Sequence, residues 1–511
     1  MPPLLATLVC AMFVGALFVL NRERDQPATP AVWLPAIWMS LGATRMMSQW
    51  LGGSAGMASP EQYLEGSPLD RALLFGLLGA ALAVLAGRAR RARMASLVAA
   101  NLPMAIFLGY CALSTIWSDV PFVAFKRWTK ALGNIAMIMI VLSDPAPMVA
   151  IKRLFARTGF VLVPASVLLI KYYPDLGRVY DPWFGMASYT GVATGKNSLG
   201  ALCLLLGIAS LWRLLGVGRA AATDKRRQIM VHGAMVSMIV WLLWMAHSAT
   251  STACFVLGSA VLLGLARRRP GATPLPAALL HATALGLGLL SWSAQSHVIQ
   301  ALGRDVTLTG RTEMWNEFLA LGSDPLVGTG FESFFLGPRA EYLWAKYWWH
   351  PNEAHNGYLE IYLTLGWVGV GLFAGLIVAG YRNAVRSYSR DQYFGALRLS
   401  LFAVAIAYNF TESATKVMHP IWIAFLLAAT AVPEFATSVA QARPEKLRRP
   451  WVAAPHLRAV PPAQWRAIAR APRRYVRTGP AGSPRGGTPP RSPTTRYRRP
   501  IWQAPASRHK E

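Results

Sequence analysis

Apolar segments long enough to cross a membrane recur along most of the chain. A helix needs about 20 mainly apolar residues to span roughly 30 Å of hydrocarbon, and segments of this kind alternate with polar connections as far as residue 436. The predicted spans are 4–20, 32–50, 69–86, 98–116, 128–143, 154–172, 197–215, 229–246, 249–266, 275–296, 356–380, 397–411 and 417–436. This pattern predicts an all-α, polytopic membrane protein with about 13 transmembrane helices.

Two segments break the pattern. Residues 297–354 are the one long hydrophilic insertion between spans, and residues 437–511 are dominated by Pro, Arg, Gly, Ser and Thr. Because the second segment has too little apolar surface to form a core, we expect a disordered tail. Residues 1–436 are expected to form one membrane domain. The first span lacks a basic segment before it and a small-residue cleavage site after it, so we do not expect a cleaved signal peptide.

The distribution of charge predicts how the helices are oriented in the membrane. The chain carries a net charge of +28 although only 14% of its residues are charged. With an outer N-terminus and alternating connections, the basic clusters at 88–93, 225–227 and 267–269 fall on one side. The positive-inside rule makes that side cytoplasmic. It therefore predicts a periplasmic N-terminus, a cytoplasmic C-terminus and an extracytoplasmic 297–354 loop.

The basic tail is predicted to lie on the cytoplasmic side, where it could contact the membrane surface. Its arginines would be drawn to anionic lipid headgroups within a Debye length. Membrane lipids are therefore the expected partners and nucleic acid is not expected, although binding of RNA or of a partner protein is the alternative interpretation of such a charge run.

The four cysteines indicate no metal or disulfide chemistry. All lie inside predicted spans, and none has the CxxC spacing of a zinc site. They are interpreted as small apolar packing residues: Cys10, Cys111, Cys203 and Cys254.

The sequence EAHNGYLEIYLTLGWVGVGL, residues 353–372, places ionisable residues at the mouth of a predicted span. Its polar head contains Glu353, His355 and Asn356, and an apolar segment follows without a turn signal. Ionisable groups at such a position are costly unless they are used. His355 and Asn356 are therefore candidate site residues, the alternative for His355 being a satisfied polar residue without a catalytic role.

A second candidate site lies at 192–206, VATGKNSLGALCLLL. Lys196 and Asn197 stand where a membrane helix is predicted to begin, and the N–H groups and partial positive charge of a helix N-terminus suit a phosphate or pyrophosphate. Alternatively, Asn197 is only an N-cap and Lys196 only an interfacial anchor. Arg178, in the same predicted outer loop, is a further candidate cation.

The long loop supplies an arginine and a glutamate. LTGRTEMWNEFL, residues 308–319, predicts an amphipathic helix from Arg311, whose guanidinium can bind phosphate oxygens through two parallel hydrogen bonds. The alternative is a surface ion pair with Glu313 or Glu317. SDPLVGTGFESFF, residues 323–335, contains Glu332 and predicts a tight turn in which Gly328 and Gly330 bring the backbone close to another segment.

The aromatic segment AEYLWAKYWWH, residues 340–350, has two interpretations. It predicts an interfacial helix in the headgroup region, and stacking on sugar rings is the alternative.

These motifs resemble a known superfamily. HNGYLEIYLTLGWVGVGL, preceded by GRTEMW and GTGFESFF, is similar to the shared region of the O-antigen ligases and the O-antigen and exopolysaccharide polymerases. KNSLG is similar to the exopolysaccharide-polymerase branch. The resemblance covers about residues 30–435 and does not separate ligase from polymerase.

The resemblance implies an enzymatic activity and roles for individual residues. It implies a metal-independent, inverting glycosyltransferase of the GT-C type without a cofactor, which takes a glycan on undecaprenyl pyrophosphate at the outer leaflet of the bacterial inner membrane. The acceptor is a glycan in a polymerase, which we favour, and lipid A core in a ligase. Arg311 and Lys196 would stabilise the leaving pyrophosphate, His355 would be the base, and Glu332 would be the alternative base.

The alternative function is that of a transporter or flippase of lipid-linked sugars. Such proteins place ionisable residues near the bilayer midplane and often contain repeated halves. Here the charges gather in one late loop and no repeat is evident, which favours the transferase.

Overall fold

The computed structural model describes residues 1–21, 28–52, 66–88, 91–180, 187–219, 222–268, 311–322, 324–347 and 349–431. All of them belong to the compact unit Met1–Thr437. The predicted span 275–296, the first part of the long loop and the predicted tail 437–511 lie outside the described residues.

Helices account for nearly all of the regular structure in the described residues. The first half contains α1 (Pro3–Leu20), η1 (Pro30–Val32), α2 (Trp33–Ala43), α3 (Met47–Trp50), α5 (Pro68–Arg88), α6 (Arg91–Ala100), α7 (Leu102–Leu113), η2 (Ser114–Trp117), α8 (Pro121–Leu142), α9 (Pro147–Tyr172) and α10 (Pro174–Gly177). The second half contains α11 (Lys196–Leu215), η3 (Gly216–Arg219), α12 (Ala222–Ala246), α13 (Ala249–Ala266), α16 (Arg311–Ala320), α17 (Gly337–Lys346), α18 (Gly357–Arg390), α19 (Gln392–Tyr408) and α20 (Pro420–Ala429).

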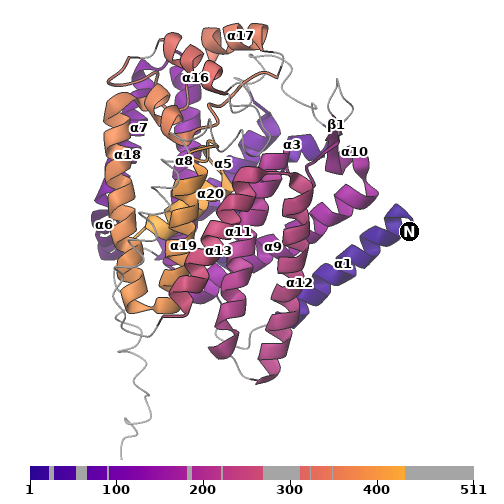
Figure 1. Cartoon of the computed structure of the whole chain (residues 1–511). Helices are drawn as coiled ribbons and strands as arrows, with labels where there is room; N and C mark the ends of the chain where they lie inside the picture. The colour runs from indigo at the N-terminus through magenta and orange to yellow at the C-terminus, as the bar shows by residue number, and fades with distance from the viewer. Residues whose placement is uncertain are drawn as a thin grey trace, which may run out of the picture. The chain divides into compact units, whose positions relative to one another are not determined.

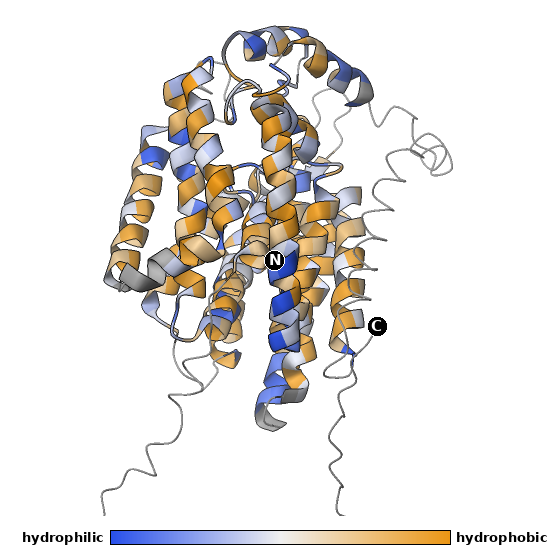
Figure 2. Ribbon diagram, turned by 90° about the vertical axis from the view of Figure 1, so that its left-hand side faces the viewer, coloured by the Kyte–Doolittle hydropathy of each residue, from blue (hydrophilic) through white to orange (hydrophobic). Residues whose placement is uncertain are grey.

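The helices confirm a polytopic helical membrane protein. In the described part of the chain, seven helices have the length and composition to cross a membrane: α1, α5, α9, α11, α12, α13 and α18. Each predicted span in the described residues overlaps a helix, and several of these helices are shorter than the predicted span. Figure 2 shows hydrophobic residues along the lengths of the helices and hydrophilic residues gathered at their ends.

One small sheet was not predicted. Strands β1 (Arg178–Tyr180) and β2 (Ala187–Tyr189) pair antiparallel, with Arg178 opposite Tyr189. This ribbon follows α9 and precedes α11.

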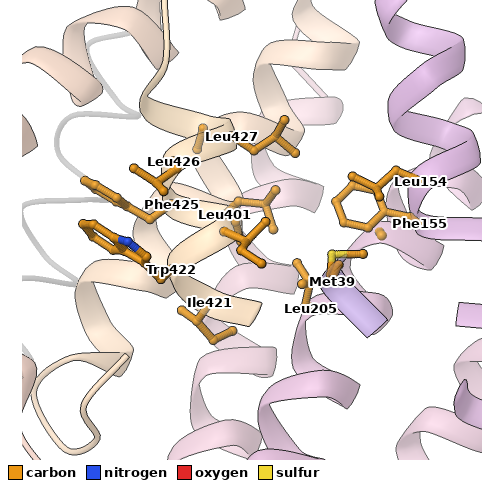
Figure 3. Packing of buried hydrophobic residues seen from close by; sticks show 14 of the residues in the cluster. Met39, Leu154, Phe155, Leu205, Leu401, Ile421, Trp422, Phe425, Leu426 and Leu427 are labelled. Carbon is orange, nitrogen blue, oxygen red and sulfur yellow. The ribbon is translucent and has the colours of Figure 1, made fainter. Parts of the chain in front are cut away.

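The core joins helices that are far apart in sequence. Side chains of α2, α9, α11, α19 and α20 pack together in one apolar cluster (Figure 3). In α20 every residue is buried, and Trp422 stacks on Phe425 with ring centroids 5.0 Å apart. Because α20 is apolar on all sides, it is stable only as a central helix surrounded by others.

Helices α16 and α17 form a second, smaller cluster at one end of the bundle (Figure 1). Phe318 of α16 and Leu343 of α17 are fully buried there against Phe334 and Phe335. Glu317 of α16 holds α17 by an ion pair with Lys346. The long loop is therefore a packed cap in its described part.

The broken helix α18 fixes this cap to the bundle. Gly366 has φ 62° inside α18, so the helix is interrupted there. The interruption frees backbone groups, and the turn at 325–330 satisfies them: Thr329 N–H donates to Leu363 O (3.1 Å) and Gly330 N–H donates to Thr364 O (2.8 Å). The close backbone approach predicted for this turn is confirmed. Non-helical backbone at membrane depth is stable only with such internal partners.

We expect Gly366→Ala to destabilise the fold. The conformation φ 62°, ψ −167° is essentially restricted to glycine and costs another residue about 1–3 kcal/mol, and a Cβ at Gly366 would also collide with the backbone of Leu326. The purified Gly366→Ala variant should unfold at a clearly lower temperature than the wild type. Gly371→Ala is the matched control in the same helix, because a Cβ there meets nothing within 4 Å. Equal unfolding temperatures for the two variants would contradict this account of the interruption.

Candidate active site

Polar side chains from four distant segments meet at Glu412, which lies between α19 and α20. Its side chain is only 8% exposed. Oε1 of Glu412 accepts hydrogen bonds from Asn197 Nδ2 (2.9 Å) and from Arg311 Nη2 (3.3 Å). Oε2 lies 3.1 Å from Nδ1 of His355. We call these four residues the Glu412 centre. A buried carboxylate needs such partners, since an unpaired one would be strongly destabilising.

The local structure explains why each member reaches the centre. Arg311 and Asn197 lie in the first turns of α16 and α11, and His355 stands two residues before α18. His355 has φ 50°, which directs the chain into the cap of that helix. The ends of α11, α16, α18 and α19 therefore gather on the same side of the bundle.

His355 has a defined tautomer in its neutral form. Its Nδ1 lies 3.1 Å from Glu412 Oε2 and 3.1 Å from Glu353 Oε1. Two carboxylate oxygens next to one ring nitrogen require a proton on that nitrogen, so Nε2 carries the lone pair. The imidazole is 32% exposed. His355 is thus oriented by carboxylates and presents a basic nitrogen that a substrate can reach.

Glu353 links the centre to a lysine. Its carboxylate pairs with Lys416 Nζ at 2.9 Å. Burial raises the pKa of the Glu353 carboxyl, but the charges of Lys416 and His355 outweigh burial and bring it to about 2. Because the folded pKa is depressed, the stabilisation is fully present above about pH 4.5 and is lost as the pH falls towards 2.

Arg311 pairs with Glu412 instead of with the partners considered from the sequence. Its Nη1 donates to Thr411 O (2.6 Å) and its Nη2 to Glu412, whereas Glu317 pairs with Lys346. The Arg311 side chain is 20% exposed. A guanidinium has five N–H donors, so donors remain for an anion.

A cavity of about 450 Å³ lies beside Lys416. Lys416 and Asn352 line it, and Lys416 Nζ also donates to Asn352 O (3.0 Å) and pairs with Glu353. Because Glu353 also contacts His355, the Lys416–Glu353 pair links the cavity to the centre. Other charged residues that line the cavity are Asp70, Arg71, Lys126, Arg127, Lys130, Glu332 and Glu360.

Lys196 and Glu332 lie near the centre without touching Glu412. Lys196 is the exposed first residue of α11, next to Asn197, and none of the described residues forms an ion pair with it. Glu332 lines the cavity, where its Oε1 accepts from Val417 N–H (3.0 Å) and its Oε2 lies 4.0 Å from Arg127 Nη1.

Two sequence candidates have other roles in the structure. Asn356 is 1% exposed, and its Oδ1 accepts the N–H groups of Tyr358 and Leu359, so it caps α18. Arg178 donates twice to Ile170 O at the end of α9. Both side chains complete helix termini, which explains their polarity without a substrate.

The centre also has the spacing of a metal site. Ligand atoms of Glu353, His355 and Glu412 lie within 4.8 Å of one another, and histidine with carboxylates can bind a divalent ion. However, the Glu353 carboxylate is paired with Lys416 and the Glu412 carboxylate with Arg311. These cations already neutralise the carboxylates, so the arrangement fits an organic acid–base centre better than a metal centre.

Glu412 and Lys416 were missed from the sequence. They lie in YNFTESATK, residues 408–416, a short polar segment between two apolar runs. An ionisable residue between two closely spaced membrane helices is the signal that could have identified Glu412.

The fold and the site define a multi-pass membrane protein with a cluster of paired ionisable residues where several helices begin or end. Residues 184–374 match the O-antigen ligase family. The chain is also 25% identical, over 301 residues, to the exopolysaccharide production protein ExoQ of Rhizobium meliloti, a match that covers 54% of this chain and 63% of that protein. Together the two matches support the superfamily of O-antigen ligases and exopolysaccharide polymerases that the motifs indicate. The family region includes Asn197, Arg311 and His355 and ends before Glu412.

Proposed function

We propose that this protein is a membrane glycosyltransferase that acts on glycans linked to undecaprenyl pyrophosphate. The observation that carries the proposal is the convergence of Arg311, His355 and Asn197 on Glu412, beside a cavity lined with cations. A base, a permanent cation and a pocket for a charged substrate are the parts that such a transfer needs. The matches to the ligase family and to an exopolysaccharide production protein support the same class.

The proposed step is a single displacement. Nε2 of His355 takes the proton of an acceptor hydroxyl while that oxygen attacks the anomeric carbon of the donor sugar. The bond from this carbon to the pyrophosphate oxygen breaks, and its electron pair leaves with undecaprenyl pyrophosphate. Attack opposite to the leaving group inverts the anomeric configuration. Arg311 and Lys196 stabilise the charge that develops on the pyrophosphate, so no metal ion is needed.

Polymerisation is the form of the reaction that we favour. The curated relative is an exopolysaccharide production protein, which supports a glycan acceptor over lipid A core. Glycan analysis of a deletion strain tests this choice. Loss of polymer length supports a polymerase, whereas accumulation of lipid-linked polymer that never reaches lipid A core supports the ligase.

We propose that the Glu412 centre faces the periplasm in the inner membrane. The first turns of α5, α8, α11 and α18 all contribute to the centre or to its cavity, together with the segment after α19. Alternating membrane crossings place all of these helix ends on one side. The basic connections fall on the opposite side, which the positive-inside rule makes cytoplasmic, as for the C-terminus.

A transporter would fit one feature, the interrupted helix α18, since transporters use broken helices at their binding sites. Here the interruption at Gly366 is filled by the 325–330 turn. The ionisable residues of the Glu412 centre lie at helix ends, where two substrates can meet. This placement supports a transferase.

We expect Arg311→Lys to lose most of the activity although the charge is kept. Arg311 contacts Thr411 O and Glu412 with two nitrogen atoms and has donors left for a phosphate, whereas a lysine is a point charge that cannot hold this geometry. Complementation of a deletion strain, read as polymer length, measures the effect. Arg339→Lys is the matched control, because Arg339 lies in the cap and also pairs with an acid, Asp119 of the segment between η2 and α8, away from the centre. Polymer of normal length from the Arg311 variant would reduce Arg311 to a structural residue.

A further inference from the structure

Three cations of α8 line one side of the cavity. Lys126, Arg127 and Lys130 follow one another at spacings that place them on one face of the helix. Arg71, in the first turn of α5, lines the cavity as well. None of these four residues belongs to the Glu412 centre. The protein therefore has a second group of cations, which shares the cavity with Lys416.

The acidic side chains in the same lining already have donors. Asp70 accepts from the N–H (2.9 Å) and the hydroxyl (2.5 Å) of Ser48. Glu332 accepts from the N–H of residue 417, and Glu360 from the N–H of residue 354. These hydrogen bonds stabilise the acids without using the lysines of α8.

Within the described ranges neither lysine of α8 forms an ion pair with an acid, although the charges of Glu332 and Asp70 act on Lys130. Lys126 Nζ lies 4.6 Å from the ring centroid of Phe122, and no hydrogen bond or ion pair joins Lys130 to a described residue. Arg127 Nη1 donates to Glu332 O (2.8 Å). An anion could therefore bind both lysines without breaking an existing ion pair.

Apart from the charged residues, the cavity is lined by apolar side chains and by uncharged polar ones such as Thr129, Thr194 and Asn352. Beyond the cations its lining includes Trp38, Leu41, Leu74, Phe75, Leu78 and Val123. Leu74 and Leu78 lie one and two turns along α5 from the charged first turn. A ligand with an anionic head and a hydrocarbon chain fits this arrangement, because the head would contact the cations and the chain would contact the leucines that follow them along α5.

We propose that this cavity binds the phosphate group of a second polyprenyl-linked substrate, the acceptor. This inference rests on the proposed function, in which Arg311 and Lys196 serve the pyrophosphate of the donor. A polymerase whose two substrates are both carried on a polyprenyl lipid needs two such sites. Lys416 lines the cavity and pairs with Glu353, whose carboxylate lies 3.1 Å from His355 Nδ1, so this ion pair connects the proposed acceptor site to the base.

Native mass spectrometry of the full-length protein with undecaprenyl pyrophosphate as the probe tests the proposal. We expect two bound lipids per wild-type chain and one per chain for the Lys126→Gln/Lys130→Gln double variant. Lys130→Arg should retain two, because the charge is kept. Lys171→Gln is the matched control and should also retain two, since this α9 lysine contacts Trp241 outside the cavity.

Two results would overturn the proposal. One is a double variant that still binds two lipids. The other is equal occupancy of the cavity by phosphatidylglycerol, which would make the lysines an anchor for ordinary headgroups. His355→Ala separates this inference from the proposed function: it should abolish transfer and still bind two lipids. Lipid binding without any transfer by the wild type would refute the transferase and leave the lipid site standing.

Discussion

His355→Ala is expected to abolish polymer formation while the protein remains folded. The imidazole is the one group of the Glu412 centre that can accept a proton at a free ring nitrogen, and loss of a general base typically costs about 10²–10⁴-fold in rate. His355 is one-third exposed at the end of a helix, so its removal leaves no core cavity. His355→Gln should keep only a little activity, because an amide can orient a hydroxyl but cannot take its proton.

His350→Ala is the matched control for this prediction. His350 lies in the same cap, has a similar left-handed φ of 49°, and stacks on Trp344 with centroids 4.6 Å apart. It has no contact with the Glu412 centre in the described part of the chain. Complementation of a deletion strain should give full-length polymer with the His350 variant and none with the His355 variant. Equal polymer length from both would remove His355 from the mechanism.

Glu412→Gln is expected to lower the rate of transfer strongly, with a smaller effect on stability. The amide keeps the shape of the side chain but loses the charge that fixes the proton on His355 Nδ1 and neutralises Arg311. An amide at this position can also donate to Nδ1, which favours the wrong tautomer. We expect a loss of about 10²–10⁴-fold, as for the base itself. Glu412→Ala should in addition destabilise the fold, because it leaves Arg311 without its partner.

Glu317→Gln controls for the loss of one acid in the cap. Glu317 also accepts from several donors, Lys346, Tyr342 and Tyr347, but it lies away from the Glu412 centre. Turnover by the purified Glu317 variant should match that of the wild type. A Glu412→Gln protein with wild-type turnover would show that Glu412 only holds segments together.

The hydrophobic pattern predicted the helices well because span length is set by membrane thickness. The close backbone approach of the 325–330 turn was predicted from Gly328 and Gly330, since glycines in a tight turn allow backbone contact. Arg311, His355 and Asn197 were each identified from a charge or amide at the end of an expected helix. Their common partner Glu412 was not, because contacts between segments that are 57 to 215 residues apart cannot be derived from local patterns.

Two of the predicted site residues make structural contacts that the sequence did not indicate. Arg178 and Asn356 are polar residues at helix ends, and a helix end needs hydrogen-bond partners whether or not a substrate binds there. Sequence spacing does not distinguish a cap from a ligand. The cavity between α5 and α8 was also not predicted, because it depends on how distant helices pack.

A transfer reaction with the purified protein and defined substrates tests most directly whether the protein transfers glycan without a metal ion and with His355 as the base. The wild type would receive an undecaprenyl-pyrophosphate-linked glycan donor and a lipid-linked glycan acceptor, in the presence of a chelator. Longer glycan and free undecaprenyl pyrophosphate should form in equal amounts, the chelator should have no effect, and His355→Ala should be inactive. Loss of the reaction on chelation, or wild-type turnover by His355→Ala, would contradict this mechanism.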